Sequence, residues 1–177
     1  TPIKDLYIIE PEVYGDHRGW FFESYSIDKF RKIGIETIFK QDNHSSSIAG
    51  VLRGLHFQLP PKPMIKLVRC TKGRLWDVAV DLRKKSETYM KWFGVELSAD
   101  NKKMLYVPAG FGHGFYALED CEIMYKCSAT FESKLDSGIA WNDPGINVEW
   151  PISDSLELIL SDKDTKLSNL KDAKLPF

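Results

Sequence analysis

Short runs in which apolar residues alternate with polar ones, or follow one another directly, recur along the whole chain. Most have the length of a β-strand, are rich in β-branched and aromatic residues, and are bounded by Gly, Pro, Asn or Asp. We expect strands at residues 6–10, 20–25, 37–41, 51–57, 65–70, 75–82, 92–97, 104–107, 115–118 and 122–129. The pattern therefore predicts a protein that is mostly β.

The clearest alternation lies at residues 75–82. Successive side chains of a strand point to opposite faces, so Asp77 and Asp81 are expected to share one face. The opposite face then carries the apolar residues Trp76, Val78, Val80 and Leu82. This strand is therefore expected to present acidic side chains on one side only.

A single short helix is indicated near the N-terminus. Ser26 can cap its start, Asp28 suits its positive N-terminal end, and Gly34 offers a left-handed stop. So many short strands at close spacing favour a closed barrel or a double-sheet jelly roll, because these architectures hide the hydrogen-bonding edges of strands. We expect an all-β jelly roll with few short helices, whose interior forms a pocket for a small ligand.

Length and composition point to one ordinary globular domain. The chain has 177 residues, no repeat and no dividing linker, so we expect a single domain over residues 1–177. With 43% hydrophobic and 28% charged residues, disordered and collagen-like classes are excluded. The net charge of −1 provides no overall field that would attract nucleic acid or anionic lipid. Any anionic ligand must be bound by a local cluster of cations.

The cysteines and the N-terminus bear on the cellular setting. Cys70, Cys121 and Cys127 show neither CxxC spacing nor an even number, so we expect reduced, buried thiols rather than a zinc ribbon or a disulfide framework. Residues 1–5 contain no basic segment leading into an apolar run, and no later stretch of about 18 residues is free of charge. We expect a cytoplasmic protein that does not contact membranes.

Polar residues that could carry chemistry are dense between positions 41 and 69. In a regular strand His56 and Gln58 share one face, whereas Arg53 and Leu55 point to the other. His56 could therefore face the interior. A lone strand histidine is more often a hydrogen-bonded core residue, so this run by itself favours a structural role for His56.

A second polar signal is the glycine-rich segment at 108–115. Pro108, Gly110 and His113 form a PxGxxH turn, which resembles the second motif of cupin barrels. Metal-binding cupins also have a first motif that supplies two histidines and a glutamate. The corresponding slot at His56 has no second histidine and no Glu a few residues on. We therefore expect a jelly-roll enzyme that holds no metal and no other cofactor.

Landmarks in a fixed order span nearly the whole chain. They lie at residues 15–23, 41–45, 51–58, 66–69, 77–83, 110–115, 141–144 and 160–164. Together they resemble the dTDP-4-dehydrorhamnose 3,5-epimerases, the cupin-fold sugar-nucleotide epimerases of rhamnose biosynthesis. The resemblance implies a cupin-type jelly roll and an isomerase that inverts C3, C5 or both in a dTDP-4-keto-6-deoxyhexose. Such inversion requires a base, stabilisation of an enolate, and an acid on the opposite face of the sugar.

The resemblance assigns four residues to the chemistry. His56 corresponds to the base and Asp164 to its carboxylate partner, which selects the imidazole tautomer and favours the protonated form. Asp77 is a reserve candidate for that partner. Lys66 corresponds to a cation beside the sugar carbonyl, and Tyr125 to the acid. By residue type alone, Asp164 would be a solvated loop acid, Lys66 a solvent-facing lysine and Tyr125 a packing residue.

The resemblance also implies a set of substrate-binding residues. Arginine suits a diphosphate because its planar fork matches two phosphate oxygens. The set comprises Arg18 and Arg53 for the diphosphate, His113 for the phosphates and sugar, Phe21 for stacking on the pyrimidine, and Glu23, Gln41 and Asn43 for hydrogen bonds to its edges. Phe21 is equally plausible as a core residue, and Arg53 or His113 as support for a turn or an ion pair. In the family the N-terminal segment reaches into the neighbouring subunit's pocket, so the resemblance implies a homodimer with shared sites.

The chain departs from the family pattern at several positions. Thr130 and Phe131 stand where many relatives have two aromatic residues, which removes a hydroxyl near the expected site. Residues 59–65 form a proline-rich loop, and His17 and Trp20 replace the usual Glu and Phe. Which carbons are inverted and which nucleotide is bound therefore stay open. The alternatives are a single-site epimerase, a metal-dependent cupin such as an oxygenase, and a non-catalytic sugar-nucleotide-binding protein.

Overall fold

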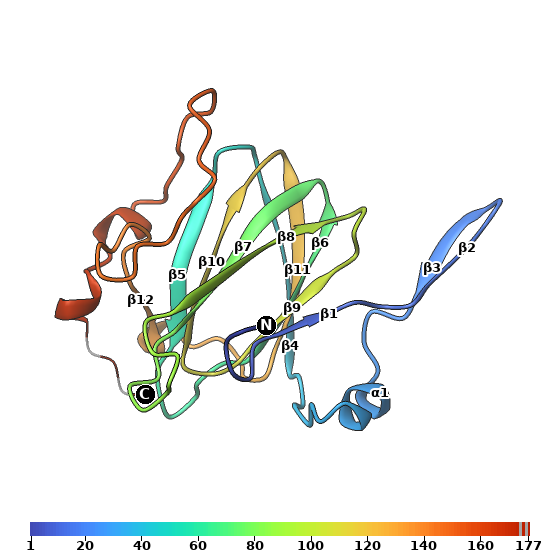
Figure 1. Cartoon of the computed structure of the whole chain (residues 1–177), viewed down its shortest axis with the longest axis horizontal. Helices are drawn as coiled ribbons and strands as arrows, with labels where there is room; N and C mark the ends of the chain where they lie inside the picture. Colours follow the sequence, from blue (N-terminus) through green and yellow to red (C-terminus); the bar gives the residue numbers. More distant parts are fainter. Residues whose placement is uncertain (174, 176) are drawn as a thin grey trace.

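Two five-stranded antiparallel sheets pack face to face in the computed structural model, which describes residues 1–173, 175 and 177 (Figure 1). The first sheet has the strand order β1 (Tyr7–Ile9), β9 (Met104–Val107), β6 (Lys66–Lys72), β11 (Cys121–Cys127) and β4 (Gln41–Ser47). The second has the order β12 (Asp136–Gly138), β5 (Leu52–Gln58), β10 (Phe111–Ala117), β7 (Arg74–Asp81) and β8 (Trp92–Ser98). The prediction of a mostly β protein is confirmed.

The remaining elements lie outside the two sheets. A hairpin of β2 (Val13–Asp16) and β3 (Gly19–Phe22) projects away from the body, and helix α1 (Ile27–Lys32) follows it (Figure 1). Three short 3-10 turns are η1 (Ser133–Leu135), η2 (Asp164–Lys166) and η3 (Leu170–Asp172). No helix within the described residues is long and apolar enough to cross a membrane.

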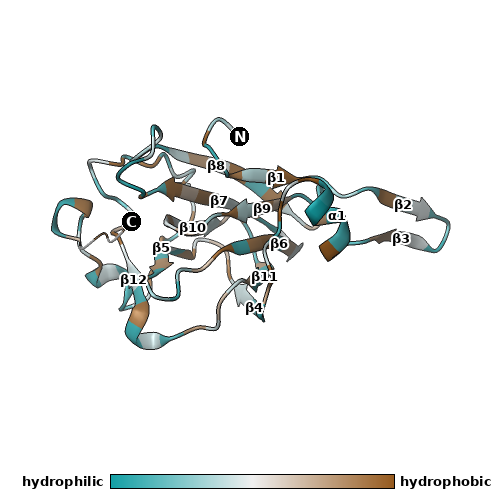
Figure 2. Cartoon of the chain, turned by 90° about the horizontal axis from the view of Figure 1, so that it is seen from below, coloured by the Kyte–Doolittle hydropathy of each residue, from teal (hydrophilic) through white to brown (hydrophobic). Residues whose placement is uncertain are grey.

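The space between the sheets is filled by alternate side chains of both layers. Val68, Leu105 and Ile123 come from the first sheet, and Ala79 and Phe115 come from the second. All five are buried, and the strands carry both brown and teal segments in Figure 2. Such alternation is what a strand with one face toward a core requires. The cysteines follow the same rule, since all three are buried with free thiols, as predicted.

Strand β7 is buried on both faces. Val78 and Val80 pack outward against Leu170 and Leu175 of the C-terminal segment, which covers this side of the second sheet. The predicted separation of the faces holds, but the acidic face does not reach solvent, because Asp77 and Asp81 are both 0% exposed. Buried carboxylates need hydrogen-bonding partners, so this face is expected to carry fixed polar networks.

Some predicted boundaries are wrong. The expected strand at 37–41 is not formed, and the strand in this region is β4, which begins where that range ends. Its seven residues, Gln41 to Ser47, are all polar and alternate in exposure at one edge of the sheet, so no apolar pattern marks them. The expected strand at 115–118 covers only the end of β10, because its glycines suggested a turn.

The single helix forms where expected. Ser26 occupies the N-cap position, but its side chain makes no capping hydrogen bond, so the predicted role of its hydroxyl is wrong. Gly34 has φ +85°, as the expected left-handed stop requires. The backbone N–H of Gly34 donates to the carbonyl of Arg31 at 3.0 Å and closes the last turn.

A bulge at Gly54 changes the direction of one predicted site residue. His113 of β10 pairs with His56 of β5. Phe115 lies two residues after His113, but it pairs with Arg53, which lies three residues before His56. Cross-strand partners point to the same face, so Arg53 and His56 both face the interior. The prediction that they point to opposite faces is therefore wrong. Arg53 Nε instead reaches the Ser47 hydroxyl in the other sheet at 3.1 Å.

Only glycine fits at this bulge. Gly54 has φ +138°, and a Cβ there would lie 2.5 Å from Gly114 Cα. A Cβ on Gly114 would lie 2.6 Å from the Arg53 carbonyl oxygen. Two adjacent backbones thus touch without intervening side chains, which is a recurrent use of glycine in strands.

We predict that Gly54→Ala lowers the free energy of unfolding by about 3 kcal/mol or more, because backbone strain and a steric clash add. Gly34→Ala is the matched control, since Gly34 also has positive φ but a Cβ there would meet nothing within 4 Å. It should cost about 1 kcal/mol. Urea denaturation measures both values, and equal losses would contradict the account of the bulge.

Candidate active site

A pocket of about 170 Å³ opens between the two sheets. The first sheet contributes Asn43, Lys66 and Tyr125, and the second contributes His56 and Gln58. The pocket is completed by Phe57, Met64, Phe131, Asp136 and Lys163. Four of the lining residues, Asn43, His56, Lys66 and Tyr125, are ones that the sequence analysis named as site residues. The other six, Phe57, Gln58, Met64, Phe131, Asp136 and Lys163, were missed. Lys163 was within reach of prediction because it lies directly beside Asp164 in the last landmark.

His56 and Asp164 form a close pair although they are 108 positions apart in the chain. The Nε2 of His56 lies 2.5 Å from Oδ1 of Asp164, which is only 3% exposed. Ser161 donates its hydroxyl to the other carboxylate oxygen at 2.7 Å. Burial by itself would raise the pKa of Asp164, but the hydrogen bonds from His56 and Ser161 outweigh it and hold the pKa below its ordinary value. Asp164 is therefore a carboxylate at neutral pH.

A second polar network lies deeper in the sandwich. The Nζ of Lys66 lies 3.4 Å from Nδ1 of His113, and Nε2 of His113 lies 2.9 Å from Oδ1 of Asp77. Asp77 is thus the partner of His113 and not of His56, for which it had been the reserve candidate. Burial lowers the pKa of both Lys66 and His113, although the charge of Asp77 opposes each shift. His113 is therefore a neutral imidazole at pH 7.

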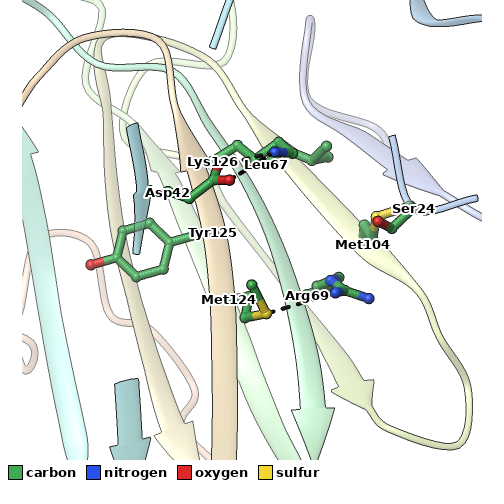
Figure 3. A pocket seen from close by; sticks show the side chains of 8 residues that line it. All are labelled: Ser24, Asp42, Leu67, Arg69, Met104, Met124, Tyr125 and Lys126. Carbon is green, nitrogen blue, oxygen red and sulfur yellow. Dashed lines mark hydrogen bonds and ion pairs between the residues drawn. The ribbon is translucent and has the colours of Figure 1, made fainter. Parts of the chain in front are cut away.

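Tyr125 points from β11 into the pocket. In Figure 3 its ring lies on the opposite side of the strand from Met124 and Lys126, which line a smaller hollow on the outer face of the sheet. Burial raises the pKa of Tyr125, and a hydrogen bond from Asn43 offsets only part of this rise. The phenol therefore keeps its proton at neutral pH and can donate it.

The remaining predicted binding residues fall into two groups. Gln41 and Asn43 lie on the inner face of β4, where Gln41 Nε2 donates to Asn43 Oδ1 at 2.9 Å, and Arg53 is exposed and donates to the Ser47 hydroxyl. The other group consists of Arg18, Phe21 and Glu23, and it lies on or beside the β2–β3 hairpin, which projects away from the two sheets (Figure 1). Arg18 forms an ion pair with Asp16 at 2.5 Å, and Glu23 forms one with Lys29 at 3.1 Å.

Within the described residues, His, Cys, Asp and Glu form no group of three that could hold a metal ion. Both histidines of the interior instead have a carboxylate partner, Asp164 for His56 and Asp77 for His113. Asp136 forms an ion pair with Lys163 at the pocket. The site thus combines an imidazole, a lysine and a phenol around one small space.

We predict that the free energy of unfolding falls as the pH drops below 6.5, the ordinary pKa of histidine. Because burial lowers the folded pKa of His113, the unfolded chain takes up a proton in this range that the folded chain does not. The fall from this group reaches at most about 1.4 kcal/mol per pH unit. Urea denaturation at several pH values should show a shallower dependence for His113→Asn, and an unchanged dependence would contradict the buried neutral imidazole.

Comparisons with known proteins identify relatives over the whole chain. The sequence model of the dTDP-4-dehydrorhamnose 3,5-epimerase family matches residues 1–172. The dTDP-4-dehydrorhamnose 3,5-epimerase of Methanothermobacter thermautotrophicus is 49% identical over 97% of this chain and 93% of its own length.

Solved structures agree with this match. The crystal structure of the Elizabethkingia anophelis dTDP-4-dehydrorhamnose 3,5-epimerase is 47% identical, with a TM-score of 0.92, over 97% of this chain and 94% of its own. A Legionella pneumophila dTDP-6-deoxy-D-glucose-3,5-epimerase, solved in complex with dTDP-4-keto-L-rhamnose, is 40% identical with a TM-score of 0.94, over 98% of this chain and 92% of its own. The predicted cupin-type jelly roll is thereby confirmed. The chain belongs to the dTDP-4-dehydrorhamnose 3,5-epimerase family.

Proposed function

We propose that this protein inverts C3 and C5 of a dTDP-4-keto-6-deoxyhexose in dTDP-rhamnose biosynthesis. The observation that carries the mechanism is the convergence of His56, paired with Asp164, and Tyr125 on one pocket. C3 and C5 both adjoin the C4 ketone, so loss of a proton from either carbon gives an enolate with its charge on the same oxygen. One base, one cation and one acid can therefore serve both carbons in turn.

His56 is the proposed base. Its Nε2 is engaged by the carboxylate of Asp164, so that nitrogen carries the hydrogen and Nδ1 has the free lone pair for the substrate proton. Asp164 stabilises the imidazolium that forms when the proton arrives. Because the pKa of Asp164 is lowered, its carboxylate is charged at neutral pH and can stabilise that imidazolium.

Lys66 is the proposed partner of the enolate oxygen. His113 Nδ1 accepts one of its three N–H groups, which leaves two for the substrate. Burial lowers the pKa of Lys66, and an ammonium group with a lowered pKa is a stronger hydrogen-bond donor toward a developing negative charge. Asp77 balances this charge through His113, so His113 and Asp77 act as positioning residues for Lys66.

Tyr125 is the proposed acid that returns a proton to the opposite face. Its raised pKa supports this role, since a phenol that ionised near neutral pH would have no proton to give. Asn43 is its partner across the strands and also lines the pocket. Arg53 is the proposed contact for the diphosphate, because it is exposed and its guanidinium extends from β5 to Ser46 and Ser47 of the other sheet.

We also propose that two copies of the chain share their sites. The hairpin that carries Phe21 exposes several large apolar side chains, namely Val13, Tyr14, Trp20 and Phe21. Exposed apolar surface on a projecting hairpin favours insertion into a partner. Such insertion would bring Arg18, Phe21 and Glu23 to a second copy's pocket. Sedimentation should give a mass of twice 20.3 kDa, and a stable monomer would contradict the shared site.

The cytoplasmic location, the single domain and the lack of a cofactor stay predictions.

A single-site epimerase is the alternative function. It is favoured by one feature, the exposed Phe131 in place of a hydroxylated aromatic residue at the pocket. A missing hydroxyl beside the proposed acid could leave one of the two carbons without a proton source. The count of exchanged protons separates the two functions.

We predict that the protein, incubated with dTDP-4-keto-6-deoxyglucose in deuterated water, incorporates two deuterons into the sugar. Each inversion replaces a carbon-bound proton by one from solvent, so mass spectrometry counts the carbons directly. One deuteron would establish a single-site epimerase. No exchange would refute the proposed function.

The variant His56→Ala serves as the test of the base within the same experiment. Its exchange rate should fall at least about a hundredfold, the usual contribution of a positioned acid or base. His44→Ala is the matched control, because His44 lies on β4 with its side chain 52% exposed and pairs only with Glu122. Equal exchange rates in His56→Ala and His44→Ala would show that His56 is not the base.

A further inference from the structure

The rim segment, Thr130 to Glu132, has no regular secondary structure, and Phe131 is its residue that lines the pocket. Phe131 lines the pocket but is 56% exposed, so packing contributes little to its placement. An aromatic ring in such a position needs another constraint if it is to stay at the pocket. That constraint is found in the backbone of the segment.

Two glutamine side chains hold this backbone from opposite sheets. Gln41 of β4 accepts a hydrogen bond from the Phe131 N–H at 2.8 Å. Gln58 of β5 accepts one from the Glu132 N–H at 2.9 Å and donates to the Thr130 carbonyl at 3.2 Å. Three consecutive residues are therefore tied to both layers of the sandwich.

The orientation of both amides is set by further partners. Gln58 is only 4% exposed, and its Nε2 also donates to the Lys62 carbonyl at 2.7 Å. The amide of Gln41 is tied to Asn43. A buried amide with all its partners satisfied has one preferred orientation, because reversing it would leave polar groups unpaired. The chain contains only these two glutamines, and both are used at the rim.

We propose that Gln41 and Gln58 are positioning residues that clamp the rim, so that Phe131 meets the bound nucleotide sugar and sets its affinity. The inference rests on the proposed function and extends it. Gln58 follows His56 by two positions on the same strand, so the clamp also fixes the distance between the rim and the base. Gln41 makes one internal hydrogen bond through each of its amide atoms, from Nε2 to Asn43 and to Oε1 from the Phe131 N–H, and these bonds support the rim.

The clamp predicts an effect on binding that exceeds the effect on chemistry. Gln58→Met keeps the length of the side chain but removes three hydrogen bonds to the rim and the 59–65 loop. We expect the Kd for thymidine diphosphate and the KM for the sugar nucleotide to rise about tenfold, which corresponds to about 1.4 kcal/mol. The value of kcat should fall by less than about twofold. Gln41→Met should give a smaller rise in Kd.

A second comparison shows whether the glutamines act through Phe131. Phe131→Ala should itself raise the Kd for thymidine diphosphate, and adding Gln58→Met to it should change the Kd little further. If Gln58→Met still raises the Kd tenfold in the Phe131→Ala protein, the glutamines do not act through Phe131, and the proposed clamp is overturned. A fall of kcat as large as the rise of KM would also overturn it.

Asn101→Leu provides the matched control for lost amide hydrogen bonds. Asn101 ties a distant turn through bonds to Ser98, Lys103 and Glu96, so its loss should lower stability without changing the Kd. Should Gln58→Met fail to fold, Gln41→Met in the half-exposed position decides the question. If the unmodified protein neither exchanges deuterium nor binds thymidine diphosphate, the proposed function fails. An active protein whose two glutamine variants bind normally overturns the clamp alone.

Discussion

The hydrogen bond between His56 and Asp164 is the contact on which the proposed chemistry depends. It joins a central strand to a turn near the C-terminus, and the turn is held in place by packing and hydrogen bonds of its own. Leu170 packs on the outer face of the second sheet, and its N–H donates to the buried Asp143 at 2.6 Å. The C-terminal segment is thus part of the site, because without its anchoring the imidazole would lose the carboxylate that orients it.

The pocket exists only because two sheets face each other. One sheet supplies the proposed enolate partner Lys66 and the acid Tyr125, and the other supplies His56. Each group is influenced by the low polarity between the layers. Burial lowers the pKa of Lys66 and raises that of Tyr125, so both are adjusted by the same closure of the sandwich. Asp164 and Asp77 are the hydrogen-bonding partners of His56 and His113, which offsets part of the cost of placing those imidazoles between the layers.

Several sequence predictions failed for identifiable physical reasons. The strand β4 has no apolar pattern because it lies at a sheet edge, where both of its faces tolerate polar residues. The direction of Arg53 was wrong because one extra residue at Gly54 reverses the alternation, and the prediction assumed a regular strand although a glycine inside a strand is a local sign of a bulge. Phe131 was noted only as a departure from relatives, since its position at the pocket depends on hydrogen bonds to two distant strands.

The sequence by itself determined that this is a mostly β protein of a recognisable family, and it predicted His56, Lys66 and Tyr125 as site residues. These features are encoded locally, in strand patterns and in short landmarks of ordered residues. The tertiary structure alone placed Asp77 beside His113 rather than beside His56, and it brought Asp164 within hydrogen-bonding distance of His56, the pairing that the resemblance implied. Contacts between residues more than a hundred positions apart depend on register and packing, which a linear pattern does not contain.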